Sequence, residues 1–335
     1  MVNENEPRAQ GSLTASPGPM SAGGSVPVLN LAYKGTGGDL FVLILKNVFL
    51  TLITLGIYAA WARTARRRFI WRQMDVGGQP LEYTGTGKEL FFGYLKVGGA
   101  YLVLFLLPGA LARIAPRVGG IVQGILVLFA VFFLVPYAVY WSRRFLLGRT
   151  RWRGIRFGLS GEAKPFAMLW LKGTLLTMVT LGIYGPIFGN RIYGMIMRNT
   201  TYGSATFSYD GSDREAFRIG LRGFLLSLVT LGIYSFWYRA EMLRFRMSHT
   251  HFDRATVRCD VTGGLLLKLT LQNMGLTLIT LGIAFPWLLS YTLREVVSRL
   301  SVVGPIDFAA IHQQASSGDA AGDSLASALG VELGI

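Results

Sequence analysis

The sequence predicts an α-helical multi-pass membrane protein with short β-strands between repeated helix–helix units. Three observations predict this class: six apolar runs of transmembrane length, a motif that recurs within four of them, and a composition that is both apolar and basic. Hydrophobic residues make up 51% of the 335 residues and charged residues 15%, yet the net charge is +15. Ordinary soluble domains carry about 25% charged residues.

The positive charge has two interpretations. Basic residues bind nucleic-acid phosphates, or they gather at lipid headgroups and on the cytoplasmic side of a membrane. Nucleic-acid binders keep an ordinary apolar content, so the composition favours the lipid bilayer as partner and excludes nucleic acid. The single cysteine, Cys259, excludes a disulfide framework within the chain. The first 28 residues contain no cleavable secretory signal, so we expect the first apolar run to direct insertion.

Each of the six apolar runs is long enough to cross a bilayer core, which takes about 20 residues in a helix. The run at 118–141 has no charged residue and is the clearest candidate. The full set is 40–62, 91–112, 118–141, 166–188, 217–238 and 264–291.

The motif TLITLGIY at 51–58 returns as TMVTLGIY at 177–184, SLVTLGIY at 227–234 and TLITLGIA at 277–284. Such self-similarity indicates a duplicated unit, and LVPY at 134–137 occupies the place of a degenerate fifth copy. Glycine permits a helix end, and tyrosine suits the boundary between apolar and wet regions. We therefore interpret the motif as a structural joint, formed by Thr54, Gly56, Tyr58, Thr180, Gly182, Tyr184, Thr230, Gly232, Tyr234 and Gly282.

Glycine-rich, strand-like stretches precede the apolar runs, and basic aromatic segments follow the joints. The strand-like stretches lie at 33–40, 83–90, 209–216 and 260–266. The predicted organisation is a disordered tail at 1–28, a membrane domain at 29–310 and a disordered tail at 311–335. The membrane domain divides into five units, at 29–80, 81–155, 156–205, 206–257 and 258–310.

Two segments carry a family resemblance. TLITLGIYAAW at 51–61, with the Arg-rich segment after it, and TLGIYGPIFGNRIYGMIMRNTTYGSATFSYDG at 180–211 resemble the YjgN family of bacterial inner-membrane proteins. The resemblance covers residues 29–308 and implies a multi-pass location in the inner (plasma) membrane. The family has no assigned activity, so it supplies no catalytic residues. The last unit departs from the pattern, because Ala284 replaces the tyrosine of the joint.

Two topologies remain open. If each run crosses once, the segments 63–90, 142–165 and 239–264 hold 18 Lys and Arg against 9 in the alternate segments, a bias that places these three inside the cell. If each unit is instead a helical hairpin that turns at the joint, the strands gather on one side and can pair with each other. The repetition of the strands favours hairpins, although five arginines in the second helix of the first unit are costly in lipid.

The candidate site is a set of recurrent cations. Lys46, Lys96, Lys172 and Arg222 occupy equivalent places in their units, and two Arg pairs follow the joints: Arg66 and Arg67, and Arg143 and Arg144. The first four either snorkel to the headgroups or join the Arg pairs around a basic interior that attracts anions. Basic residues beside aromatic residues also suit anionic lipid.

No catalytic constellation stands out, so we expect a protein that is not an enzyme and has no cofactor. His249 and His251 lack further metal ligands at suitable spacing, and no metal site is predicted. The functional interpretations are a transporter or channel for an anionic solute, and alternatively a membrane-organising scaffold that binds anionic lipid. The oligomeric state is not fixed by the sequence.

Overall fold

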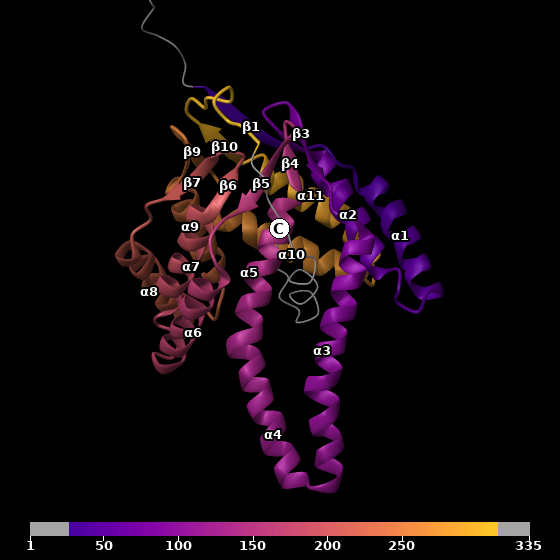
Figure 1. The fold of residues 1–335 in the computed structure, drawn as a ribbon. Helices are drawn as coiled ribbons and strands as arrows, with labels where there is room; N and C mark the ends of the chain where they lie inside the picture. The colour runs from indigo at the N-terminus through magenta and orange to yellow at the C-terminus, as the bar shows by residue number, and fades with distance from the viewer. Residues whose placement is uncertain (1–26, 314–335) are drawn as a thin grey trace, which may run out of the picture.

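The computed structural model describes residues 27–313, and its strands form a closed barrel of ten short antiparallel strands at one end of the molecule (Figure 1). Around the barrel the strands follow the order β1-β10-β9-β8-β7-β6-β5-β4-β3-β2, and β2 pairs with β1 to close it. The strands are β1 Val28–Tyr33, β2 Met74–Val76, β3 Gln79–Tyr83, β4 Thr150–Trp152, β5 Ile155–Leu159, β6 Thr200–Tyr202, β7 Ala205–Tyr209, β8 Thr250–Phe252, β9 Ala255–Cys259 and β10 Leu300–Val303.

Tight turns join β2 to β3, β4 to β5, β6 to β7 and β8 to β9. In the first turn, Gly77 and Gly78 have φ values of 58° and 83°. Two successive positive φ values are typical of the hairpin turn whose twist matches that of paired strands, and glycine adopts them without strain. The remaining closure joins the two ends of the described chain, because Val28 on β1 lies opposite Val303 on β10.

One end of the barrel is filled by aromatic side chains. Trp152, Tyr202 and Phe252 occupy equivalent places on β4, β6 and β8 and are each no more than 5% exposed. The Trp152 and Tyr202 rings are 5.5 Å apart, and the Tyr202 and Phe252 rings are 5.8 Å apart. The segment after β10 covers this cluster: the Phe308 ring lies 5.4 Å from Trp152, and Ile311 is buried against it. Among the described residues, these packed side chains close that end of the barrel.

After β1, and after the second strand of each strand hairpin, the chain forms a first helix and a second helix before the next strand begins. The first helices are α1 Gly37–Ile53, α3 Gly87–Ile114, α6 Ala163–Val179, α8 Asp213–Val229 and α10 Gly263–Ile279. The second helices are α2 Ala59–Gln73, α5 Val135–Gly148, α7 Gly185–Asn199, α9 Ser235–Ser248 and α11 Phe285–Val297. The second unit adds α4 Pro116–Phe129 and a π-helical turn, η1 Ala130–Leu134, which continue directly into α5.

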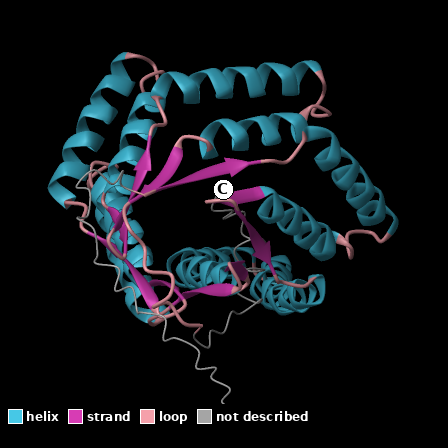
Figure 2. Cartoon of the chain, turned by 90° about the horizontal axis from the view of Figure 1, so that it is seen from above, coloured by secondary structure: helices cyan, strands magenta, loops and turns pink. Residues whose placement is uncertain are grey.

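The second helices pack against the barrel, and the first helices lie between neighbouring second helices. For example, α7 contacts β7, and α6 and α8 flank α7. Contacts of α1 with both α2 and α11 bring the first and last units together. Seen from above, the helices surround the strands; the short helices are seen along their length, whereas the long hairpin is viewed end-on (Figure 2). Figure 1 shows this hairpin, α3 and α4, extending well beyond the others.

Buried tyrosines at the barrel rim hold the helices to the strands. Tyr209, the last residue of β7, donates to the Asn190 side-chain oxygen on α7, and both residues are at least 95% buried. In the second unit the ring comes from the helix instead. Tyr140 of α5 packs against Leu159, which stands at the place of Tyr209, and donates to the Gly161 carbonyl at 2.7 Å. The space between the second helix and the barrel rim is therefore filled by a strand tyrosine in one unit and by a helix tyrosine in the other.

The predicted fold class, an α-helical multi-pass membrane protein, is wrong. The structure is a closed β-barrel that carries helices. Among residues 27–313, one helix, Pro116–Gly148, is long and apolar enough to cross a membrane. The runs at 40–62, 166–188, 217–238 and 264–291 are not continuous spans, because each breaks at the joint into an apolar helix and a separate second helix.

The glycine-rich stretches also differ from expectation. They are strand ends followed by helix starts rather than strands: β1 ends at Tyr33, and α1 begins at Gly37 after the N-cap Thr36, whose hydroxyl accepts from the Asp39 N–H at 3.1 Å. The tails expected at 1–28 and 311–335 lie mostly outside the described residues. Within the described part, Val28 begins β1 and Ile311 is buried.

Candidate functional site

The four joints have one geometry, seen clearly in the fourth unit. Leu231 and Gly232 have φ values of 49° and 90°, which end α8 and turn the chain into α9. The Thr230 hydroxyl donates to the Leu226 carbonyl at 2.7 Å and accepts from the Tyr234 N–H at 2.9 Å. A leucine held at positive φ is strained, so the glycine and the threonine bonds are what keep the turn in place. The same bonds recur at Thr54, Thr180 and Thr280.

The leucine of each joint points away from the protein. These four leucines are 87–94% exposed, and the residue two before each of them is an exposed Ile or Val. They form the tips of the four short hairpins. The exposed leucines are Leu55, Leu181, Leu231 and Leu281, and their apolar neighbours are Ile53, Val179, Val229 and Ile279.

The recurrent cations do not converge on the interior. Lys46, Lys96, Lys172 and Arg222 all lie exposed on the first helices, on the outside of the ring. Arg222 forms an ion pair with Glu241 of α9. The structure does not bring these four together with the Arg pairs around one polar interior, and their exposure fits cations that reach for headgroups.

The two Arg pairs lie on the second helices and are half-buried. On α2, the Arg67 guanidinium lies 6.0 Å from the Tyr83 ring, and Arg66 lines a cavity beside α1. On α5, the Arg144 guanidinium lies 5.0 Å from the Trp141 ring, while Arg143 has a buried Nε with no hydrogen-bond partner among the described residues. Aromatic faces offset part of the cost of removing such cations from water.

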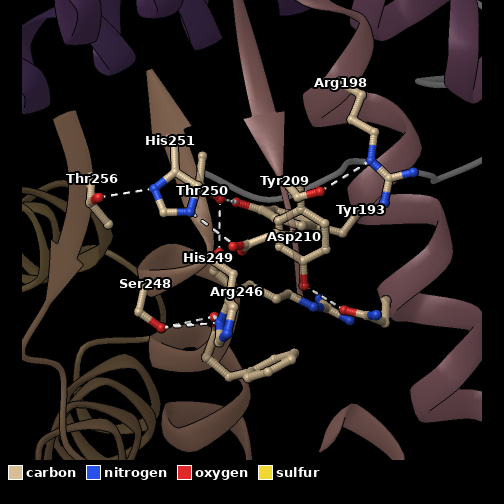
Figure 3. A network of polar contacts seen from close by, with 12 residues as sticks. Tyr193, Arg198, Tyr209, Asp210, Arg246, Ser248, His249, Thr250, His251 and Thr256 are labelled. Atoms are coloured by element: carbon tan, nitrogen blue, oxygen red, sulfur yellow. Dashed lines mark hydrogen bonds and ion pairs between the residues drawn. The ribbon is translucent and has the colours of Figure 1, made fainter. Parts of the chain in front are cut away.

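A polar network between α7, α9 and β8 escaped the sequence analysis (Figure 3). The Tyr193 hydroxyl lies 2.9 Å from Thr250 Oγ1, and the Arg246 guanidinium lies 5.5 Å from the Tyr193 ring. Arg246 Nε is buried without a partner in the described structure. Burial raises the pKa of the neighbouring Tyr209 to about 12, so this phenol remains a donor at neutral pH. The available signal was a tyrosine on α7 at the position where α2 and α5 have Arg67 and Arg143.

The two histidines are held by ordinary structural partners. His251 on β8 lies 2.9 Å from Thr256 Oγ1 through Nδ1 and 3.3 Å from Asp210 through Nε2 (Figure 3). His249 Nδ1 lies 2.8 Å from the Phe245 carbonyl. The contacts of His251 link β8 to β9 and to the residue after β7. The described residues contain no group of three or more metal-ligating side chains.

These features define a class: a ten-stranded barrel at one end, outward-running helical hairpins with exposed apolar tips, and one longer hairpin. The chain belongs to the family of bacterial proteins of unknown function DUF898, whose model matches residues 28–212, 204–256 and 237–328. The resemblance to YjgN proteins is thereby confirmed.

Two relatives bear the name inner membrane protein YjgN. The protein from Salmonella typhimurium is 29% identical over 178 residues, 50% of this chain and 43% of the relative. The protein from Escherichia coli O157:H7 is 28% identical over 163 residues, 49% of this chain and 38% of the relative. The chain thus covers less than half the length of these relatives. No solved structure matches it.

Proposed function

We propose that the protein sits in the bacterial inner membrane, with its barrel at one surface, and acts there as a scaffold that binds anionic lipid. The observation that carries this proposal is the exposure of the four tip leucines, at 87–94%. Moving a leucine side chain out of water is worth about 1.5–3 kcal/mol, so four tips contribute roughly 6–12 kcal/mol on entering lipid. Exposed apolar patches of this kind mark interaction surfaces.

The places of the recurrent cations along the first helices indicate how far each hairpin would reach into the membrane. After Lys46, α1 continues for seven residues, Asn47–Ile53, which span about 10 Å at 1.5 Å per residue. After Lys96, α3 continues over Val97–Ile114, about 27 Å, close to the hydrocarbon thickness of about 30 Å. The short helices lie across the direction of the long hairpin (Figure 2), so about 10 Å is the upper limit to the depth of their tips. With the cations at the near headgroups, the short hairpins remain in the near leaflet, and the long hairpin, which contains the start of the Pro116–Gly148 span, crosses. Arg113, in the last turn of α3, then reaches the far headgroups.

A lipid-binding role agrees with the barrel better than conduction does. The aromatic cluster of Trp152, Tyr202 and Phe252 fills one end of the barrel, so the proposal does not use the barrel as a passage. It is a proposal of binding without catalysis. The lipid contacts would come from exposed cations on the first helices, each worth about 1 kcal/mol near an anionic surface.

One observation favours transport of an anionic solute as a second candidate. Arg143 and Arg246 each have a buried Nε without a hydrogen-bond partner in the described structure, and Tyr193 lies 5.5 Å from the Arg246 guanidinium. Half-buried cations with one buried nitrogen left unsatisfied suit an anion, since a buried donor without a partner is costly. This candidate requires a route past the packed barrel end.

Lipid retention by the purified full chain tests the proposal. We expect detergent-solubilised protein to retain phosphatidylglycerol over phosphatidylcholine. The triple variant Lys46→Gln, Lys172→Gln, Arg222→Gln should bind phosphatidylglycerol up to about 100-fold more weakly, from about 1 kcal/mol per cation. Arg254→Gln is the matched control, because this exposed arginine lies in the β8–β9 turn, away from the hairpins. Equal retention by the triple variant and the control would refute the scaffold.

Solute flux separates the second candidate. Proteoliposomes loaded with chloride or phosphate should show no protein-dependent flux if the protein is a scaffold. Flux that disappears in Arg143→Gln and Arg246→Gln, while phosphatidylglycerol retention is unchanged in the triple variant, would replace the scaffold with a transporter.

A further inference from the structure

The first unit contains a groove between α1 and α2. The groove encloses a cavity of about 320 Å³ and opens toward the outer apolar surface, because two of its lining residues, Val48 and Leu52, are 49% and 70% exposed. Its lining is apolar on α1 and basic on α2. Its lining includes Ile44, Asn47, Val48 and Leu52 of α1 and Arg63 and Arg66 of α2.

The cavity is explained by a difference between the units. In the third unit the Phe188 ring of α7 packs so closely on Gly173 of α6 that a Cβ there would lie 2.0 Å from it. In the fourth unit Tyr238 packs in the same way on Gly223. The equivalent place on α2 is Ala62, twelve residues before its strand as Phe188 and Tyr238 are before theirs. A methyl group therefore stands where the third and fourth units have a ring, and Asn47 stands where they have the glycine.

The polar groups of the groove are built for an anion. Arg63 and Arg66 lie three residues apart on α2, so they share one face of the helix. Arg63 lines the groove, and its guanidinium also lies 5.9 Å from the Tyr94 ring of α3. Asn47, across from them on α1, is only 6% exposed and lines the same cavity. None of the nine residues that line the cavity is acidic.

We propose that this groove binds one anionic phospholipid, with its phosphate on Arg63 and Arg66 and the start of one acyl chain along Ile44, Val48 and Leu52. The inference rests on the proposed membrane placement and adds a defined site to it. The cations attract the phosphate, and the exposed apolar residues continue toward the tip of the hairpin, where an acyl chain would run. The cavity volume suits a headgroup and the first part of a chain, with the rest of the lipid outside.

Counting bound lipids tests the site. Native mass spectrometry of the full chain, released from detergent with phosphatidylglycerol, should show one lipid retained after the others are removed. The double variant Asn47→Gly, Ala62→Phe, which copies Gly173 and Phe188 of the third unit, should lose this lipid, whereas the matched control Asn47→Gly, Ala62→Ser should keep it. Arg63→Gln with Arg66→Gln should weaken retention at least tenfold without altering the packing of α1 on α2. If the Asn47→Gly, Ala62→Phe protein fails to fold, the double Arg variant decides.

Competition identifies the source of the phosphate. Phosphatidylglycerol should bind at least tenfold more tightly than both phosphatidylcholine and glycerol phosphate. Unchanged lipid counts in the folded Asn47→Gly, Ala62→Phe protein or in the double Arg variant would overturn the site, as would equal binding of glycerol phosphate. Flotation of the wild-type chain with lipid vesicles reports the membrane placement separately. If flotation succeeds and the single lipid is absent, only the groove is refuted; if flotation fails, the placement fails too.

Discussion

The hydroxyl of Thr230 offers a direct test of where the hairpin tips lie. Thr230→Val keeps the shape of the side chain and removes the acceptor of the Tyr234 N–H, which the hydroxyl now holds at 2.9 Å. The Leu226 carbonyl keeps a partner, because it also accepts from the Thr230 N–H at 3.0 Å. The substitution therefore leaves one backbone donor without its acceptor.

The cost of that donor depends on its surroundings. In water, solvent replaces the lost bond and the net cost is about 1 kcal/mol or less. In lipid no replacement exists, and the expected cost is roughly 2–4 kcal/mol. Denaturant unfolding of the protein in maltoside micelles measures the difference, with Thr230→Ser as the control that keeps the hydroxyl. A valine variant within about 0.5 kcal/mol of the serine variant would refute the membrane-embedded tip, since solvent replacement alone allows so small a cost.

Two further predictions concern the barrel. The Lys34 ammonium, more than the Gly78 N–H, holds the pKa of Asp75 below its usual range. This carboxylate therefore stabilises the fold at pH values above the ordinary Asp pKa of about 4. The stabilisation is lost as the pH falls through the lowered pKa. Asp75→Asn should lower the free energy of unfolding by about 1.5 kcal/mol at pH 7 and by much less at pH 3 in thermal scans; an equal loss at both pH values would contradict the ion pair. Phe308→Ala should cost about 1–2 kcal/mol, because the Arg153 guanidinium lies 4.3 Å from this half-buried ring, and should speed proteolysis of the segment after β10. Unchanged cleavage would show that Phe308 does not hold the segment.

The sequence predicted the joints in the right places, because their signal is local. A threonine, a leucine and a glycine in succession end a helix at each of their four occurrences in this chain, and Leu231 and Gly232 do so at positive φ. The hairpin arrangement was one of the two topologies that the sequence left open, favoured because strands repeated at one place in each unit share an environment. That the units arose by duplication stays a prediction, as do the absence of catalysis and the lipid partner.

The barrel could not be predicted, because its pairings are non-local. β4, β6 and β8 have three residues each, too few for a periodic signal, and closure joins Val28 to Val303 across the whole described chain. The apolar runs gave the wrong fold class for a related reason. Hydropathy is averaged over a window that includes the joint. The 17-residue helix α1 and the first turn of α2 therefore appear as one continuous span.

The site was predicted in part. Exposed Lys46 and half-buried Arg66 have the residue types expected for anion contact, but they lie on different helices and do not form one interior. The pairing of Tyr193 with Arg246 joins two units, and no spacing within one unit reveals it. The groove at Ala62 becomes visible only when the packing of Phe188 in another unit is known.

The sidedness of three positions tests the central claim most directly. Single cysteines at Arg254, in a barrel turn, at Arg117, beside the far end of the long hairpin, and at Leu231, a short tip, can be introduced into a Cys259→Ser background, because Cys259 is the natural thiol and is buried. In sealed vesicles of one orientation, a membrane-impermeant thiol reagent should label positions 254 and 117 from opposite sides and position 231 from neither. Labelling of 254 and 117 from the same side, or of 231 from water, would contradict the account.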